Sequence, residues 1–216
     1  ISYAYYVQDR LSGLSPEAQV QASGHAPIRF QSLETVDPAF PDFAAFLQSA
    51  GRGPTSAAPP VCTGPLAYKG KAALDADIRA LKSACHKAQA QAAFMSAASP
   101  GVIAMFASRT THYRSEDDYV FALAEAMKEE YDAIHRAGLM LQIDCPDLAL
   151  APQMNYGAAH DPAKIIARNI EALNIATADI PPNAMRVHLC WGNYPGPHVR
   201  DAPAATLFPH LRRLRA

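Results

Sequence analysis

His188 and Cys190 are the residues best suited to do chemistry, and they lie two apart in the apolar segment 185–190. In a β-strand, residues two apart point to the same face, so the imidazole and the thiol are expected to lie side by side. Histidine nitrogen and cysteine sulfur are preferred zinc ligands. The pair therefore predicts part of a zinc site, and a core cysteine next to a hydrogen-bonded histidine is the alternative.

A second apolar segment, 139–144, also ends in polar residues. Gln142 and Asp144 share a face of this expected strand. Sites in parallel α/β folds lie at the carboxyl ends of the strands, so two polar strand ends predict a binding site. Asp144 is a candidate anchor for a substrate ammonium group, or else a cap for the following turn. Cys145 is interpreted as a small buried residue, and Asp147 need not face the site.

Residues close to these strand ends extend the candidate site. His198 could orient a substrate or a ligand, and an exposed loop histidine is the alternative. Trp191 and Tyr194 could wall a flat substrate, although aromatic residues there also serve plain packing. Three residues in an expected loop could hold an anion: Arg109, Thr110 and His112. Three arginines near the end are interpreted as a solvated helix face: Arg212, Arg213 and Arg215.

Composition and missing motifs exclude several classes of protein. The net charge of −1 over 216 residues argues against a nucleic-acid partner. Neither a basic-then-apolar leader nor an apolar run of about 18 residues is visible, so we expect no signal peptide and no membrane partner. The four cysteines form no Cys-x-x-Cys pair, which is typical of a reduced, cytoplasmic protein. Motifs for a serine nucleophile, a dinucleotide or a P-loop are absent.

Hydrophobic periodicity predicts alternating strands and helices in residues 72–190. Strands are expected at 93–97, 139–144 and 185–190, and helices at 72–91, at 115–138 and from Asp161 onward. Ser115 with Asp118 indicates a helix start, and Gly138 indicates its end. Residues 99–101 are expected to form a loop, and 102–106 fit a strand or a helix. This alternation indicates an α/β fold with parallel βαβ units.

The remaining segments carry weaker signals. Residues 3–7 fit a strand or a helix, 42–49 a short helix, and 60–68 an extended segment. Residues 52–60 are rich in Gly, Pro, Ser and Ala and indicate an exposed loop. Residues 203–216 are weakly helical and interrupted by Pro209.

Two motifs resemble a known family. Gln-Ile-Asp-Cys-Pro-Asp-Leu-Ala at 142–149 and Val-His-Leu-Cys-Trp-Gly-Asn-Tyr-Pro-Gly-Pro-His at 187–198 are similar to the C-terminal catalytic domain of cobalamin-independent methionine synthases. The likeness is greatest to the shorter, single-domain relatives of that enzyme. Segments 2–4 and 94–103 also resemble that branch, so the similarity covers nearly the whole chain.

The resemblance implies a (β/α)8 TIM barrel of the methionine synthase and uroporphyrinogen decarboxylase-like type. It implies a cytoplasmic S-methyltransferase of methionine biosynthesis, which moves a methyl group from a methyl-folate to homocysteine. His188 and Cys190 match two zinc ligands of the family, and Asp144 matches the residue that binds the homocysteine amino group. Bound zinc lowers the pKa of the substrate thiol. We expect catalytic roles for Asp144 and His198, and substrate contacts from Gln142, Asp144 and Trp191.

Two departures from the family keep alternatives open. Cys145 replaces a family glutamate, so alkyl transfer to another thiol, such as coenzyme M, is one alternative. A complete barrel runs to about 250 residues. Matched to the family, residues 1–216 form a single incomplete barrel domain without the first strand, the last strands and two zinc ligands, a Glu and a Cys. Self-association through open sheet edges is then expected. A non-catalytic or partner-completed fragment is the second alternative, and a metal-free decarboxylase of the related barrels is a third.

Overall fold

The structure is a computed structural model that describes residues 3–15, 29–30, 40–49, 60–107, 109–155, 161–192, 198 and 201–216. Its α-helices are α1 (Tyr3–Arg10), α3 (Pro41–Ser49), α4 (Lys71–Lys87), α5 (Pro100–Phe106), α6 (Glu116–Arg136), α7 (Pro146–Leu150), α8 (Pro162–Ala176) and α9 (Ala204–Leu211). Its strands are β1 (Leu14–Ser15), β2 (Arg29–Phe30), β3 (Val61–Cys62), β4 (Phe94–Ala98), β5 (Arg109–Thr110), β6 (Met140–Asp144), β7 (Met154–Asn155) and β8 (Met185–His188). Two short 3-10 helices are η1 (Ala151–Gln153) and η2 (Pro182–Ala184).

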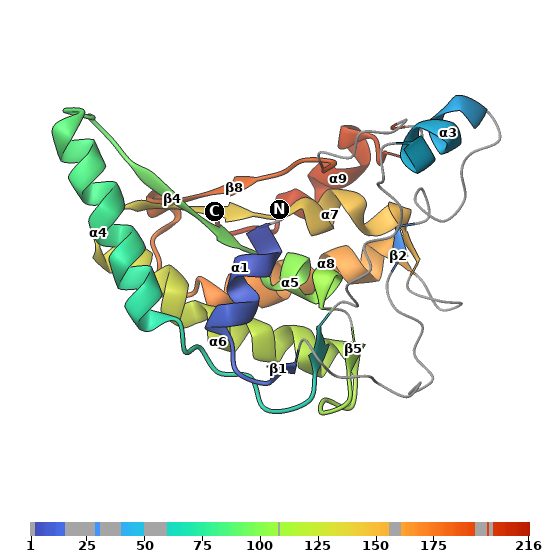
Figure 1. Ribbon diagram of the computed structural model, residues 1–216, viewed down its shortest axis with the longest axis horizontal. Helices are drawn as coiled ribbons and strands as arrows, with labels where there is room; N and C mark the ends of the chain where they lie inside the picture. The colour runs from blue at the N-terminus through green and yellow to red at the C-terminus, as the bar shows by residue number, and fades with distance from the viewer. Residues whose placement is uncertain are drawn as a thin grey trace.

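The centre of the fold is a parallel sheet in the order β4-β6-β8 (Figure 1). Helices α5 and α6 connect β4 to β6, and α7 and α8 connect β6 to β8. The predicted α/β fold with parallel βαβ units is therefore confirmed. In the described residues the sheet stays open rather than closing into a barrel.

Strand alternation gives this sheet one covered face and one open face. Three aligned residues of the covered face are Met95, Leu141 and Met185, of which the last two are buried. Helix α6 contacts β4 and β6, and α5, α6 and α8 lie on the same side of the sheet, below it in Figure 1. On the open face, Phe94 and Met140 remain 45% and 38% exposed. The open face is where polar side chains gather.

Caps predicted from the sequence set the ends of the two main helices. The Ser115 hydroxyl accepts a hydrogen bond from the Asp118 amide at the start of α6. The Asp161 carboxylate accepts two backbone amides at the start of α8. Gly138, just after α6, has φ of +77°, a left-handed conformation that glycine adopts without strain.

Several expected boundaries were wrong or incomplete. Pro100 and Gly101 begin helix α5 rather than forming a loop, because Ser99 caps that helix, and 102–106 are helical. Residues 3–7 belong to helix α1. Helix α4 ends at Lys87, short of residue 91, and α9 continues through Pro209. The expected helix at 42–49 is α3, and the expected loop at 52–60 lies, apart from residue 60, outside the described residues.

A buried carboxylate anchors the first helix to the body of the protein. Glu130 of α6 is 1% exposed and accepts hydrogen bonds from the Tyr6 hydroxyl, at 2.6 Å, and from the Tyr68 hydroxyl. Arg10 of α1 forms an ion pair with Glu130 at 3.4 Å and a second one with Asp77 of α4. Burial raises the pKa of both tyrosines, so their hydroxyl groups remain protonated donors.

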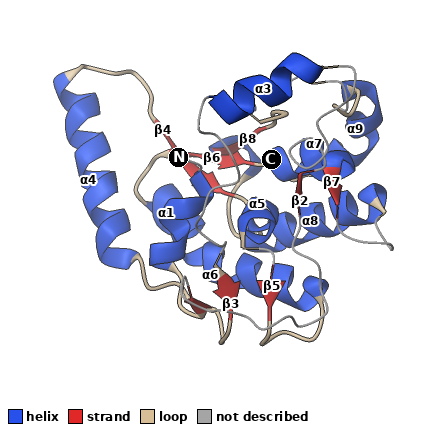
Figure 2. Ribbon diagram, turned by 45° about the vertical axis from the view of Figure 1, so that its right-hand side comes forward, coloured by secondary structure: helices blue, strands red, loops and turns tan. Residues whose placement is uncertain are grey.

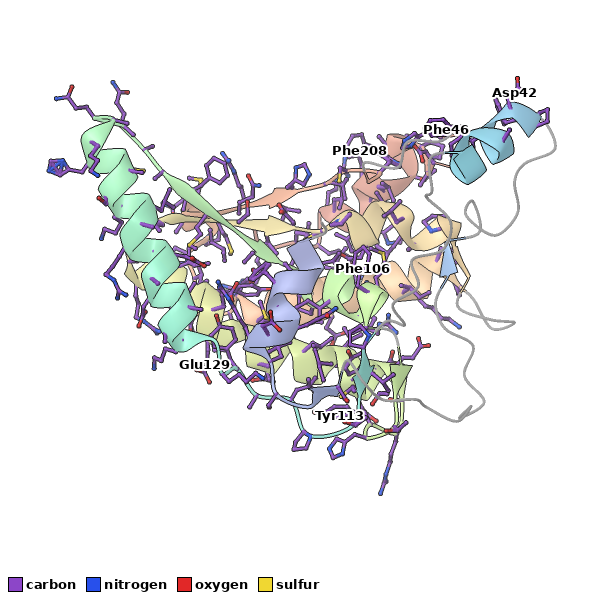
Figure 3. All side chains as sticks on the ribbon, viewed as in Figure 1. Asp42, Phe46, Phe106, Tyr113, Glu129 and Phe208 are labelled. Atoms are coloured by element: carbon purple, nitrogen blue, oxygen red, sulfur yellow. The ribbon has the colours of Figure 1, made fainter. Side chains whose placement is uncertain are left out.

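Two smaller sheets lie apart from the central one. Strands β1, β3 and β5 form one of them, and β2 pairs with β7; β3 and β5 lie at the bottom of Figure 2, away from β6 and β8. Phe46 of α3 and Phe208 of α9 are exposed and lie at the upper right of Figure 3. Within the described residues, no helix has the length and apolar character needed to cross a membrane.

Candidate functional site

The two polar strand ends predicted from the sequence lie side by side. Asp144 of β6 and His188 of β8 are aligned partners in the parallel ladder. The Cys145 amide donates to the His188 carbonyl at 2.9 Å, and the Ser99 amide donates to the Asp144 carbonyl at 3.1 Å. These bonds fix the backbone at the carboxyl edge of the sheet, where parallel α/β folds hold their ligands.

Gln142 positions the Asp144 carboxylate. Its side-chain amide donates to Asp144 Oδ1 at 3.1 Å and to the Ser96 hydroxyl at 3.0 Å. Asp144 is 5% exposed, and burial raises the pKa of its carboxyl, an effect that the Gln142 hydrogen bond and the nearby His188 partly offset. In the described residues Oδ2 accepts no hydrogen bond, yet it is not fully enclosed. This oxygen can therefore take a donor from a ligand.

The two expected metal donors, His188 and Cys190, lie at the end of β8 and just beyond it. His188 is exposed, and its ring makes no hydrogen bond or ion pair within the described part of the chain. Cys190 is a half-buried free thiol. The strand expected at 185–190 ends at His188, so Cys190 lies beyond it and strand alternation does not fix the Cys190 side chain on the face of His188.

The donor set fits only part of a zinc site. An imidazole and a thiol are ordinary zinc ligands. Among the described residues, no third histidine, cysteine or acidic residue joins them in a group that could hold a metal ion. A complete site would need further ligands.

Trp191, just after β8, connects the end of this strand to the segment before α9. The indole nitrogen of Trp191 donates to the Ala202 carbonyl at 2.9 Å. His198 is exposed, and its Nδ1 lies 2.9 Å from Asp201 Oδ2. Asp201 was missed in the sequence, although its spacing three residues after His198 is a usable signal. Tyr194 lies outside the described residues.

Residues next to the site belong to the core. Cys145 is buried, as expected, and burial raises the pKa of its thiol well above the usual value. Asp147 is 1% exposed and accepts hydrogen bonds from Ser99 at 2.6 Å and Asn169 at 2.9 Å. Asp147 therefore connects α5, α7 and α8 and does not face the candidate site.

The residues expected to bind an anion lie on a short strand and in the turn that follows it. Arg109 and Thr110 form strand β5 rather than a loop, because β5 pairs with β3. The Thr110 hydroxyl accepts the backbone amides of His112 and Tyr113 at 3.2 and 3.0 Å. Thr110 thus stabilises the turn. The terminal arginines follow α9 rather than lying on it, and Arg215 donates to the Ala178 carbonyl.

Sequence reasoning missed Ser96 and Arg186, which lie on the open face of the sheet on either side of the predicted residue Gln142. Ser96, Gln142 and Arg186 are aligned across β4, β6 and β8. The Arg186 Nε donates to Gln142 Oε1 at 2.9 Å, and its guanidinium lies 3.9 Å from the centre of the Phe94 ring. Arg186 lies two residues before His188, so strand periodicity could have placed it on the face of that residue. The alignment of Ser96 with Gln142 depends on strand pairing, which the sequence does not specify.

Neither the protein-family models nor the curated proteins compared with this sequence match it. What the site defines directly is a carboxylate, a carboxamide and an imidazole at one edge of a parallel sheet, with a thiol close by in sequence.

Proposed function

We propose that the chain is the catalytic module of a zinc-dependent thiol alkyltransferase related to the cobalamin-independent methionine synthases, built on part of a (β/α)8 barrel. The observation that carries the proposal is the alignment of Asp144 with His188 at the carboxyl edge of the sheet. The two motifs that resemble the family come from distant parts of the sequence, and this alignment brings one residue of each motif to the same edge of the sheet.

Each residue has a defined task in this proposal. Asp144, oriented by Gln142, binds the ammonium group of the substrate through its open oxygen. His188 and Cys190 hold zinc together with ligands from outside the described residues. Zinc, when bound, lowers the pKa of the substrate thiol, so that the thiolate can attack an alkyl donor.

Trp191 and His198 complete the assignment. Trp191 lines the substrate site, with its indole held at Ala202. His198 orients the substrate, and its partner Asp201 restrains the imidazole. The proposed reaction is methyl transfer to homocysteine, and alkyl transfer to coenzyme M is the variant that Cys145 leaves open.

A second candidate is a module whose site is completed by another chain, or one that no longer catalyses. The observation in its favour is the two-donor set: in the described residues no third metal-binding side chain accompanies His188 and Cys190. Among the described residues no further strand pairs with the edges of the β4-β6-β8 sheet, which offers a place for another chain to pair.

Metal content tests the proposal. Zinc per chain is measured on the purified protein and on the variants His188→Ala and Cys190→Ser. Cys85→Ser and His86→Ala in α4 are matched controls, because they remove the same chemical groups away from the sheet. We expect the site variants to lose bound zinc and the α4 variants to keep it. Zinc retained in both site variants would refute the ligand assignment, and a wild-type chain without zinc would favour the partner-completed module.

A further inference from the structure

The open face of the sheet holds a cation that the proposed site does not use. Arg186 is exposed on β8, two residues before His188. Its guanidinium is fixed from two sides: Nε donates to Gln142 Oε1, and Cζ lies over the Phe94 ring, 3.9 Å from its centre. Stacking on an aromatic ring restrains an arginine and leaves its edge available.

The terminal nitrogens of Arg186 are open to a ligand. Within the described residues they make no hydrogen bond or ion pair. When Nε is hydrogen-bonded and one face of the guanidinium is covered by an aromatic ring, the two terminal nitrogens point outward as a fork. Such a fork matches the two oxygens of a carboxylate, or two of the three of a sulfonate.

Arg186 and Asp144 share both a face and a hydrogen-bonded partner. Arg186 is aligned with Gln142, and Asp144 lies two residues further along β6, which corresponds to about 7 Å along the strand. Gln142 accepts from Arg186 through its oxygen and donates to Asp144 through its nitrogen. One carboxamide therefore orients a cation and an anion toward the same open face.

We propose that Arg186 binds the acidic group of the substrate, so that the site selects thiols that carry a carboxylate or a sulfonate. That the substrate is a thiol rests on the proposed function. That the site binds an acidic group is argued only from residues of the sheet. With Asp144 on the ammonium end, an α-amino acid satisfies both charges, because Arg186 and Asp144 contact opposite atoms of the same Gln142 carboxamide. A simple amine would leave the arginine fork without a partner.

Ligands without a thiol test the acidic subsite separately from zinc. Backbone amide chemical shifts of 15N-labelled protein are followed during titration with 2-aminobutyrate, propylamine, propionate and 1-propanol, which carry both charges, one of each, or none. We expect 2-aminobutyrate to bind about tenfold more tightly than propylamine, through the charge-assisted hydrogen bonds to Arg186. The largest shifts should occur in β6 and β8. Titration with ethanesulfonate against propionate then identifies the preferred acidic group.

Three variants assign the effect to Arg186. Arg186→Met keeps an apolar stem over Phe94 and should abolish the preference for acids, whereas Arg186→Lys should keep part of it. Arg79→Met, an exposed arginine of α4, is the matched control and should behave as wild type. Amide spectra of each variant report whether the fold is intact.

The outcomes separate this inference from the proposed function. The inference is overturned if acids and their neutral analogues bind equally, if none of the ligands binds, or if Arg186→Met keeps the preference. An acid preference that depends on Arg186, in a protein that fails the zinc test, keeps the subsite and refutes the alkyltransferase. Bound zinc without a preference for acids would refute the subsite and keep the proposed alkyltransferase.

Discussion

Replacing Glu130 by glutamine should destabilise the protein strongly, because this buried carboxylate connects α1, α6 and the segment before α4. Two tyrosine hydroxyls donate to it, and hydrogen bonds to a charged acceptor contribute about 1.5–3 kcal/mol each. Glutamine keeps one carbonyl oxygen and so keeps one of these bonds. It also removes the charge facing Arg10, whose side chain is only 11% exposed. We therefore expect a loss of about 2–4 kcal/mol in the free energy of unfolding.

Urea unfolding followed by circular dichroism measures this loss. Glu129→Gln is the matched control, because Glu129 is the exposed neighbour on the same helix (Figure 3) and should change stability by less than about 0.5 kcal/mol. Tyr68→Phe, alone and combined with Glu130→Gln, gives the coupling between the two side chains. Equal stabilities of the Glu130 and Glu129 variants, or additive effects of Tyr68→Phe and Glu130→Gln, would refute the reasoning.

Three further predictions concern the core and the helix caps. Gly101→Ala should cost about 1–3 kcal/mol in urea unfolding, because a Cβ there would lie 2.0 Å from Asp147 Oδ2; a variant as stable as wild type would contradict the close packing. Ser115→Ala should cost about 1 kcal/mol by removing the cap of α6, whereas Ser115→Asp should retain most of it. Burial raises the pKa of Asp147 above 3.8, so the folded state keeps this proton where the unfolded chain has lost it. The stability that Asp147 contributes is then largest at low pH and falls as the pH rises through the folded pKa; the difference in unfolding free energy between wild type and Asp147→Asn should fall accordingly, and a rising difference would contradict the sign.

Local signals predicted the elements that position the site. Ser115, Asp161 and Gly138 identify helix ends through short-range backbone chemistry, and all three act as expected. The polar ends of β6 and β8 were found because strand alternation is local, and adjacent parallel strands place them together.

Features that depend on distant residues were not predictable in this way. Glu130 resembles any acidic residue of an amphipathic helix, and only the fold brings Tyr6 and Tyr68 to it across 124 and 62 residues. The orientation of Arg186, unlike its face of the strand, required the neighbouring strands, because Phe94 and Gln142 fix its guanidinium. Helix α5 was missed at its start because Ser99 followed by proline and glycine fits a turn as well as a cap.

The long separation between α1 and Glu130 has a consequence for synthesis on the ribosome. Tyr6 is translated 124 residues before the carboxylate that accepts its hydroxyl. At roughly 5–20 residues per second, this delay is about 6–25 s, which is very long compared with the microsecond formation of a helix. During that interval α1 lacks the acceptor on α6, and β4 and α5, which it contacts, also follow it in the chain. Helix α1 can thus complete its docking only after α6 has emerged, and until then the Tyr6 hydroxyl lacks the acceptor that it has in the folded protein.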